Sequence, residues 1–373
     1  MIDRLYTFFM NKIKLFFKLM LPYYRRFIRL LAMPYCYISL VNWQECKKGR
    51  LAVFFDLWYI FLKMKSYPDF YSPCRLWEKD RESWTNYYGS IYDAYQRKKL
   101  SIEVTPPEYK IIFDDKRICH EFCESKNLPV PKSYGTIHPA DNFRLQLTNI
   151  IDKNDLLKVI MKPLLGHAGM GILFANKINH DIFIHTADGE KFSIDTFNLQ
   201  EPYIIQEIIT QHSKIAQISP SSVNTIRFVT LLTKENNVLI VGALMRFSAT
   251  NSLIDNWSAG GLAIGIDIDS GSLLEYAYDK HGNRFKEHPI SRTSFNGIII
   301  PNWTEALYLT KKAQLMFPYY KMLGLDMAIS SNGPIIIEIN SDPDNIMLEQ
   351  TYGPILRKAE IRKAFGDYDL LLY

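Results

Sequence analysis

From about residue 101 onward, strand-like and helix-like patterns of apolar residues alternate along the chain. Residues 109–115 have the apolar run of a short strand, residues 116–127 have helical spacing, and Pro129 and Pro131 bar continuation of that helix. The segments "LLKVIMKP" and "YIIQEII" are typical of buried strands, and "VNTIRFVTLL", "VLIVGALMRF" and "GLAIGIDID" of successive antiparallel strands. With the amphipathic helix "TEALYLTKKAQLMF", this pattern predicts an α+β fold with a mostly antiparallel C-terminal sheet.

Near the C-terminus, two apolar strands flank the sequence "SNG" at 331–333, which predicts a hairpin. Glycine suits the left-handed position of a three-residue loop, and such a loop places Asp326 directly opposite Glu338. Opposed side chains share one face of the sheet, with Cβ atoms about 5 Å apart. Asn340, two residues beyond Glu338, points to the same side. A two-residue loop of Asn332 and Gly333 would instead separate these side chains.

Two carboxylates held close together beside a sheet repel each other and lose hydration, so a bare pair is costly. A divalent cation removes that conflict. Two carboxylates and one amide are oxygen ligands, which favour Mg²⁺ or Mn²⁺ over zinc. Asp326, Glu338 and Asn340 are therefore the predicted metal ligands. The alternative is an acid that is satisfied by a nearby lysine or arginine.

The segment "IMKPLLGHAGMGI" places Lys162 at the end of a strand and three glycines in the loop that follows. Unhindered backbone N–H groups in such a loop can close over anionic oxygens, although an ordinary glycine turn has the same composition. The spacing matches neither the P-loop nor the Rossmann fingerprint. Lys116, which follows Asp114 and Asp115, is a second candidate cation or the solvated start of a helix.

In chain order, Asp115-Lys116, "MKPLLGHAGMG", "YIIQE", Asp326 and "EIN" resemble the ATP-grasp fold over about residues 110–350. More narrowly, "SPSSVNTIRFVT", "MRFSATNSLIDNWSAGGLAIGID" and "GLDMAISSNGPIIIEINSDPD" resemble the sugar-transfer-associated ATP-grasp proteins, which are found with glycan and exopolysaccharide biosynthesis. The resemblance implies ATP clasped between two α+β subdomains, at 101–205 and 206–373. An aromatic, basic helical region at 1–100 precedes them, in place of the small α/β domain with which such ligases usually begin.

The resemblance also implies which residues bind the nucleotide and the metal ion. The implied nucleotide-binding residues are Lys116, Lys162, Gly166, His167, Gly169, Gly171, Gln206, Glu207 and Ile208. Asn224 and Arg227 begin a strand and are expected to face the nucleotide or the acceptor. The implied ligands of Mg²⁺ or Mn²⁺ are Asp326, Glu338 and Asn340, in agreement with the hairpin geometry.

Enzymes of this type usually activate a carboxylate as an acyl phosphate, which an amine or thiol then attacks. Charge that develops on the phosphate calls for a preplaced cation. Peptide-forming relatives often carry an arginine just before the first metal aspartate, where this chain has "LGLD". The predicted catalytic residues are therefore Lys162 and Arg246, and the alternative for Arg246 is a core network with an acid. The predicted substrate-binding residues are Arg246, Asp255, Asn256, Gly260 and Gly261. The last four follow the strand of Arg246, in a mobile loop that orders over the acceptor or in a long hairpin.

The predicted function is an ATP- and Mg²⁺-dependent ligase that joins a carboxylate, of an amino acid or a uronic acid, to an amine in glycan assembly. A kinase that passes phosphate to a hydroxyl and stops is the first alternative. A membrane-associated nucleotide-binding scaffold without turnover is the second.

Charge along the 373-residue chain is uneven. Residues 1–33 contain seven lysines and arginines against the single acid Asp3, although the whole chain is only +5. The basic pI therefore describes an N-terminal patch and predicts no nucleic-acid partner. Residues 1–33 have the pattern of a basic, Phe-rich amphipathic helix, which suits either a membrane interface or a helix docked on its own protein. The expected location is the cytoplasm. If the N-terminal helix binds membrane, the expected position is peripheral, at the inner face of the cytoplasmic membrane.

The five cysteines are an odd number in a large, core-rich chain, which favours reduced thiols of a cytosolic protein. Cys119, His120 and Cys123 lack a second ligand pair, so packing within a helix is expected rather than a metal site. The apolar run at 51–64 contains Asp56 and is shorter than the ~20 residues that a membrane-spanning helix needs.

Overall fold

The computed structural model describes residues 20, 23–89, 103–166, 169–250, 252, 253, 255 and 260–371. The chain forms two compact units. Unit 1 comprises Met1–Val104, Asp344–Gln350 and Pro354–Tyr373, and unit 2 comprises Thr105–Pro343 and Thr351–Gly353. Unit 1 thus unites the aromatic N-terminal region with the last helices of the chain.

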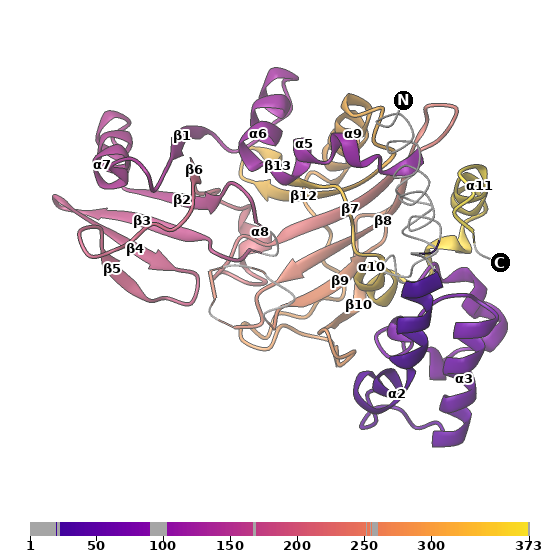
Figure 1. Ribbon diagram of the computed structural model, residues 1–373. Helices are drawn as coiled ribbons and strands as arrows, with labels where there is room; N and C mark the ends of the chain where they lie inside the picture. Colours follow the sequence, from indigo (N-terminus) through magenta and orange to yellow (C-terminus); the bar gives the residue numbers. More distant parts are fainter. Residues whose placement is uncertain are drawn as a thin grey trace, which may run out of the picture. The chain divides into compact units, whose positions relative to one another are not determined.

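Unit 2 contains two sheets in which every strand pairing is antiparallel (Figure 1). The first sheet has the order β1-β6-β2-β3-β4-β5. Its strands are β1 (Ser133–Ile137), β2 (Lys158–Pro163), β3 (Leu173–Ile178), β4 (Asp181–Thr186), β5 (Lys191–Ser193) and β6 (Tyr203–Gln206). The second sheet has the order β11-β10-β9-β8-β7-β12-β13. Its strands are β7 (Thr225–Leu232), β8 (Val238–Phe247), β9 (Leu262–Ile266), β10 (Leu273–Tyr278), β11 (Arg284–Phe285), β12 (Met322–Ser330) and β13 (Gly333–Asn340).

Helices cover one face of each sheet in unit 2. The helices and helical turns of unit 2 are η6 (Pro107–Tyr109), α5 (Ile111–Asp114), α6 (Lys116–Ser125), α7 (Phe143–Lys153), α8 (Ser213–Ala216) and α9 (Trp303–Met316). Leu147 and Ile151 of α7 pack with Val159 on the first sheet. α9 and α6 pack on the second sheet, and Cys119 and Cys123 belong to that core. The α+β fold with an antiparallel C-terminal sheet is therefore confirmed.

Residues 111–114 form helix α5, so the strand predicted at 109–115 is wrong. Pro107 begins the preceding 3-10 turn, because its fixed φ suits a first helical position. Phe113 then packs against Phe317 and Tyr320, whereas Ile111 is exposed. Burial of one ring at helical spacing outweighs the β propensity of the isoleucine pair.

The C-terminal hairpin pairs Asp326 with Glu338, as predicted, but by a different route. Ser330 pairs with Gly333, so the loop contains only Ser331 and Asn332, and the predicted three-residue loop is wrong. A β-bulge next to Asp326 then adds one residue, Ile337, to β13 and restores the pairing.

Unit 1 is helical and rich in aromatic side chains, as predicted. Residues 23–31 are helical. They precede α2 (Met33–Tyr35), η1 (Cys36–Leu40), α3 (Arg50–Leu62), η2 (Pro68–Phe70), η3 (Leu76–Glu78) and η4 (Arg81–Asn86), and the C-terminal elements are α10 (Asn345–Thr351), η8 (Ile355–Arg357) and α11 (Ala359–Asp367). Within the described part of the chain, no helix is both long and apolar enough to cross a bilayer.

Two buried carboxylates hold unit 1 together. Asp56, which interrupts the apolar run of α3, is fully buried and paired with Lys48 and Arg81. Glu349 accepts hydrogen bonds from the backbone N–H groups of Tyr88 and Gly89 at 2.7 and 2.9 Å. Burial raises the pKa of Glu349 to about 8. These contacts attach the segment 344–350 to the N-terminal residues of the chain.

Candidate nucleotide and metal site

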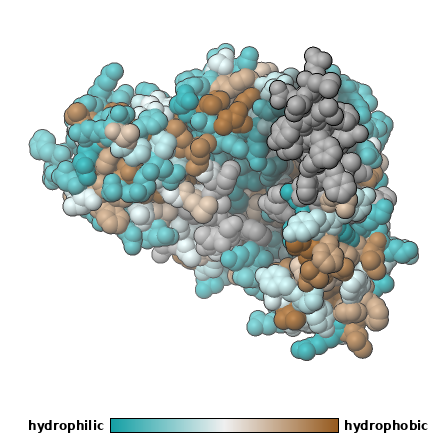
Figure 2. All heavy atoms as spheres, viewed as in Figure 1, coloured by the Kyte–Doolittle hydropathy of each residue, from teal (hydrophilic) through white to brown (hydrophobic). Residues whose placement is uncertain are grey.

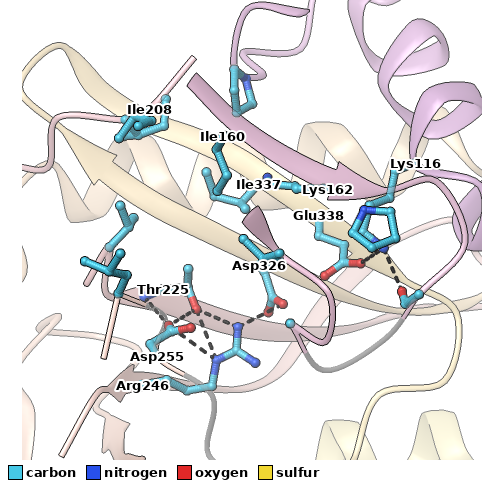
Figure 3. A pocket seen from close by; sticks show the side chains of 18 of the residues that line it. Lys116, Ile160, Lys162, Ile208, Thr225, Arg246, Asp255, Asp326, Ile337 and Glu338 are labelled. Atoms are coloured by element: carbon cyan, nitrogen blue, oxygen red, sulfur yellow. Dashed lines mark hydrogen bonds and ion pairs between the residues drawn. The ribbon is translucent and has the colours of Figure 1, made fainter. Parts of the chain in front are cut away.

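A cleft in unit 2 is lined by strands of both sheets and by the loop that follows β2 (Figure 3). It contains roughly 1150 Å³ of empty space, part of it open to solvent. Its apolar wall consists of Pro131, Ile160, Pro163, Met170, Ile172, Phe174, Ile208, Ile209, Val223, Leu253 and Ile337. Its charged residues are Lys116, Lys162, Glu207, Arg227, Arg246, Asp255, Asp326 and Glu338.

Lys116 is placed in this cleft by the start of α6. Asp115 caps the helix by accepting hydrogen bonds from the N–H groups of Arg117 and Ile118. The Lys116 ammonium donates to the Gly166 carbonyl at 2.6 Å and lies 3.3 Å from a Glu338 carboxylate oxygen. Lys116 therefore ties the glycine-rich loop to the acidic hairpin instead of extending into solvent.

Lys162 is a buried cation at the end of β2. Its exposed fraction is 8%, and no hydrogen bond or ion pair joins its ammonium to any residue that the structure describes. Burial lowers the pKa of Lys162 to about 8, although the nearby carboxylate of Glu338 opposes that shift. A buried ammonium of this kind is poised to gain an anionic partner.

Asp326 is held by two arginines at the floor of the cleft. Arg227 lies directly opposite it on β7 and makes a two-pronged ion pair through Nε and a terminal nitrogen, the latter at 2.7 Å. Arg246 of β8 approaches the same carboxylate at 3.0 Å. Burial alone would raise the pKa of Asp326, but the two guanidinium groups outweigh it and lower that pKa.

Asp255 and Thr225 complete this network (Figure 3). The Asp255 carboxylate accepts hydrogen bonds from the Thr225 N–H at 2.9 Å and hydroxyl at 2.5 Å. Arg246 donates to the same hydroxyl at 2.6 Å and lies 3.7 Å from Asp255. Burial raises the pKa of Asp255 despite these partners. Arg246 thus does pair with acids, as the alternative interpretation held, but it does so at the wall of the cleft.

The three predicted metal ligands all line the cleft. The Asn340 amide nitrogen lies 3.4 Å from Asp326 Oδ2, and Glu338 has Lys116 as its ion-pair partner. The donor set therefore suits Mg²⁺ in type. Asp326, however, already accepts from Arg227, Arg246 and Asn340. A metal ion on Asp326 requires one of these donors to move, whereas Glu338 is more open.

Several other predicted residues lie away from the cleft lining. The Gln206 side chain contacts the buried His120 ring at 3.3 Å. The fully buried Asn224 amide donates to Gln211 Oε1 and to the Ser219 carbonyl. Asn224 therefore secures the turn before β7. The remaining predicted residues that do not line the cleft are Gly171, Gly260 and Gly261, and His167 and Asn256 lie outside the described residues.

Glu207 and Ile208 do line the cleft, although Glu207 also binds backbone with its carboxylate, which accepts from the Lys132 N–H at 2.8 Å. Sequence reasoning missed Ile160 and Thr225. Ile160 stands two residues before Lys162, and Thr225 stands two residues before Arg227. Residues two apart on a strand point to the same face, so this spacing predicts that both side chains face the cleft.

Gly171 fixes the end of the glycine-rich loop. Its φ is +73°, and an added Cβ would lie 2.9 Å from Pro163 Cγ. We expect Gly171→Ala to lower the free energy of unfolding by about 2–3 kcal/mol, since it combines backbone strain with overpacking. Gly189→Ala, at φ +93° with open space around it, carries only the strain and should cost about 1 kcal/mol. Equal losses in chemical denaturation would contradict the close approach to Pro163.

Two antiparallel sheets around a cleft with clustered cations and an acidic hairpin define a protein of the ATP-grasp class. Residues 95–363 match the family described as sugar-transfer associated ATP-grasp, and the chain belongs to that family. No curated protein matches the sequence.

Solved structures similar to this chain include a synthetase and two ligases. N5-carboxyaminoimidazole ribonucleotide synthetase from Thermotoga maritima has a TM-score of 0.36 and 11% identity, over 65% of this chain and 46% of that one. D-alanine–D-alanine ligase from Bacillus anthracis has a TM-score of 0.35 and 12% identity, over 70% and 66%. Phosphoribosylamine–glycine ligase from Thermotoga maritima has a TM-score of 0.40 and 11% identity, over 72% and 57%. The chain thus spans less than two thirds of the length of each.

Proposed function

We propose that this chain is an ATP- and Mg²⁺-dependent carboxylate–amine ligase that acts through an acyl phosphate in glycan assembly. The observation that carries the proposal is the convergence of four cations and two acidic hairpin residues on one apolar-walled cleft, in a chain of the ATP-grasp family. The cations are Lys116, Lys162, Arg227 and Arg246, and the hairpin residues are Asp326 and Glu338.

The nucleotide base fits the apolar wall, where Ile160 of β2 pairs with Phe174 of β3. Lys162, at the end of the same strand, then meets the phosphates as a buried cation without another partner among the described residues. Lys116 holds the Gly166 carbonyl, which keeps the glycine-rich loop next to the phosphates. Glu338, Asp326 and Asn340 would hold the metal ion, which neutralises phosphate charge when bound.

Arg227 takes the place of the arginine that is absent before Asp326. Gly324 stands two residues ahead of Asp326, and a Cβ there would lie 3.4 Å from Arg227 Cδ and 3.0 Å from Pro343 Cβ. The small residue on β12 thus leaves room for a long side chain from β7. With Arg246, this guanidinium faces the point where charge develops during phosphoryl and acyl transfer.

In the proposed reaction, a carboxylate oxygen of the first substrate attacks the γ-phosphorus, and ADP leaves. The amine of the second substrate then attacks the acyl carbon, an amide bond forms and inorganic phosphate leaves. Lys162, Arg227 and Arg246 stabilise the negative charge in both steps without taking a proton. The amine loses its proton to solvent.

The direct test incubates the full chain with ATP, Mg²⁺ and pools of amino acids, uronic acids and nucleotide sugars, and identifies products by mass spectrometry. We expect ADP and phosphate in equal amounts, a new amide, and a hydroxamate when hydroxylamine replaces the amine. A phosphate ester that resists hydroxylamine would show a kinase instead. Absence of nucleotide binding and of turnover in every pool would overturn the proposal.

Nucleotide binding should depend on pH through Lys162. The pKa of Lys162 is lowered to about 8 in the free protein, and phosphate oxygens favour its charged form, so binding takes up a proton. We expect ATP affinity to fall about tenfold between about pH 7 and pH 9, because the free lysine loses its proton over that range. Calorimetry in buffers of different ionisation enthalpy measures both effects. Lys162→Arg should remove them, since a guanidinium remains charged, and a pH dependence that persists in this variant would exclude Lys162 as its source.

A further inference from the structure

Two helical segments of unit 1, α3 and residues 23–31, present apolar side chains on their exposed faces, and α3 is mainly apolar on its buried face as well. In α3, the side chains of five apolar residues fall within about 100° of one another at 100° per residue, and four of them are exposed. These five residues are Leu51, Phe54, Phe55, Trp58 and Leu62. Asp56 lies on the opposite face, where Lys48 and Arg81 bind it in the interior. A helix that is apolar on its exposed face needs an apolar neighbour outside the protein.

The helical residues 23–31 repeat this arrangement. Arg26 donates to the Phe61 carbonyl and places its guanidinium 3.4 Å from the centre of the Phe61 ring. Arg29 lies over the ring of Tyr67. The side chains on the far side of the helix are exposed, and they are Tyr24, Phe27, Ile28 and Leu31. The helix therefore docks by its arginines and presents its apolar face to the surroundings. Most of the amphipathic helix predicted at 1–33 lies outside the described residues.

The exposed apolar residues of unit 1 are concentrated rather than scattered. Of the 26 exposed large apolar side chains among the described residues, 13 lie between Met20 and Leu62. Apolar side chains gather over α2 and α3 on the face that Figure 2 shows. A concentration of exposed apolar side chains in one region of a soluble protein often marks a binding surface.

The positive charge around the exposed apolar side chains indicates what binds them. Residues 23–65 contain eight lysines and arginines and only two acids, Glu45 and Asp56. Glu45 is paired with Arg75, and Asp56 is buried. A second copy of this chain would bring the same positive charge to the contact. An anionic lipid surface brings the opposite charge together with an apolar interior, and tyrosine and tryptophan are favoured at that boundary.

We propose that the exposed faces of residues 23–31 and α3 form one membrane-binding surface, which inserts into the headgroup region of an anionic bilayer. Leu51 and Phe55 enter the apolar boundary, and exposed basic residues beside them contact lipid phosphates. These basic residues are Arg25, Lys47, Arg50 and Lys63. The surface lies on the bilayer and does not cross it. This inference is independent of the reaction proposed for the cleft.

The test is co-sedimentation of the full chain with vesicles of phosphatidylcholine alone or with about one third phosphatidylglycerol. We expect binding to the anionic vesicles that weakens with salt, and a partition coefficient about tenfold lower for the double variant Leu51→Ser, Phe55→Ser. The matched control is the double variant Leu157→Ser, Tyr308→Ser. Both side chains lie in unit 2 and are similarly exposed, so this variant should bind vesicles like the original protein.

The same variants separate the membrane from other occupants. Ligase turnover in solution should be unchanged in Leu51→Ser, Phe55→Ser, because neither residue lines the cleft. Absence of vesicle binding by the full chain at low salt, or equal loss of binding in the control, would overturn the proposal. Self-association in sedimentation velocity that the double variant abolishes, without vesicle binding, would show that the surface is an interface between copies of this chain.

Discussion

Glu338→Gln should reduce ATP turnover by a factor of roughly 10²–10³ while leaving the fold intact. Glu338 has one ion-pair partner, Lys116 at 3.3 Å, and its side chain is 28% exposed, so the loss of its charge costs little stability. The neutral amide, however, is a poor ligand for a hard divalent ion. The measurement is steady-state ADP release together with thermal unfolding of the same samples.

The matched control is Glu305→Gln, an exposed glutamate on α9 that is distant from the cleft lining. It should match the original protein in both assays. Retention of more than about a tenth of the turnover in Glu338→Gln would remove this carboxylate from the proposed metal site.

Asp326→Asn should destabilise the protein by about 3–5 kcal/mol, in addition to removing turnover. The substitution removes the carboxylate that balances the guanidinium groups of the buried Arg227 and the partly buried Arg246. Asp255 lies 3.7 Å from Arg246, farther than Asp326 at 3.0 Å, and so replaces Asp326 poorly as its partner. Urea denaturation at neutral pH measures the change in free energy of unfolding.

Asp342→Asn is the control for the loss of an ion-paired aspartate. Its partner Lys110 lies at 2.8 Å, and both side chains are substantially exposed, so the expected cost is about 0–1 kcal/mol. If Asp326→Asn lowered the free energy of unfolding as little as Asp342→Asn, Asp326 would not be needed to balance the charge of Arg227 and Arg246. The contrast between Asp326 and Glu338 thus separates a proposed metal ligand that also stabilises the fold from one that acts mainly on the bound ligand.

The acidic hairpin could be predicted because residue identity and strand period both pointed to it. Asp326 and Glu338 do face each other, yet the loop is one residue shorter than predicted, and the bulge at Ile337 compensates. Local sequence does not reveal a bulge, because the extra residue is an ordinary isoleucine within an apolar strand. The correct pairing was therefore reached through an incorrect loop.

Contacts between distant strands were beyond prediction from the sequence. Arg227 and Arg246 share one carboxylate only because β7 lies between β12 and β8 in the sheet. Gln206 was expected beside the nucleotide, but its amide turns to His120 on α6. Nothing in the sequence near Arg227, Arg246 or Gln206 indicates these partners. Periodicity identifies the face of a strand, whereas the neighbouring strand decides what that face meets.

Unit 1 shows a similar limit at the scale of the whole chain. The segments 344–350 and 354–373 pack with the N-terminal region, although they directly follow the acidic hairpin in sequence. The tie is Glu349, whose buried carboxylate binds the backbone at Tyr88 and Gly89. A single glutamate in a helical pattern carries no sign that it is buried.

Calorimetric titration of the full chain with a non-hydrolysable ATP analogue, with and without Mg²⁺, tests the central claim most directly. One analogue should bind per chain, and its affinity should fall sharply when Mg²⁺ is withheld or when Glu338 is replaced by glutamine. Absence of binding heat under all conditions, or equal affinity with and without Mg²⁺, would contradict a metal-bound triphosphate in the cleft.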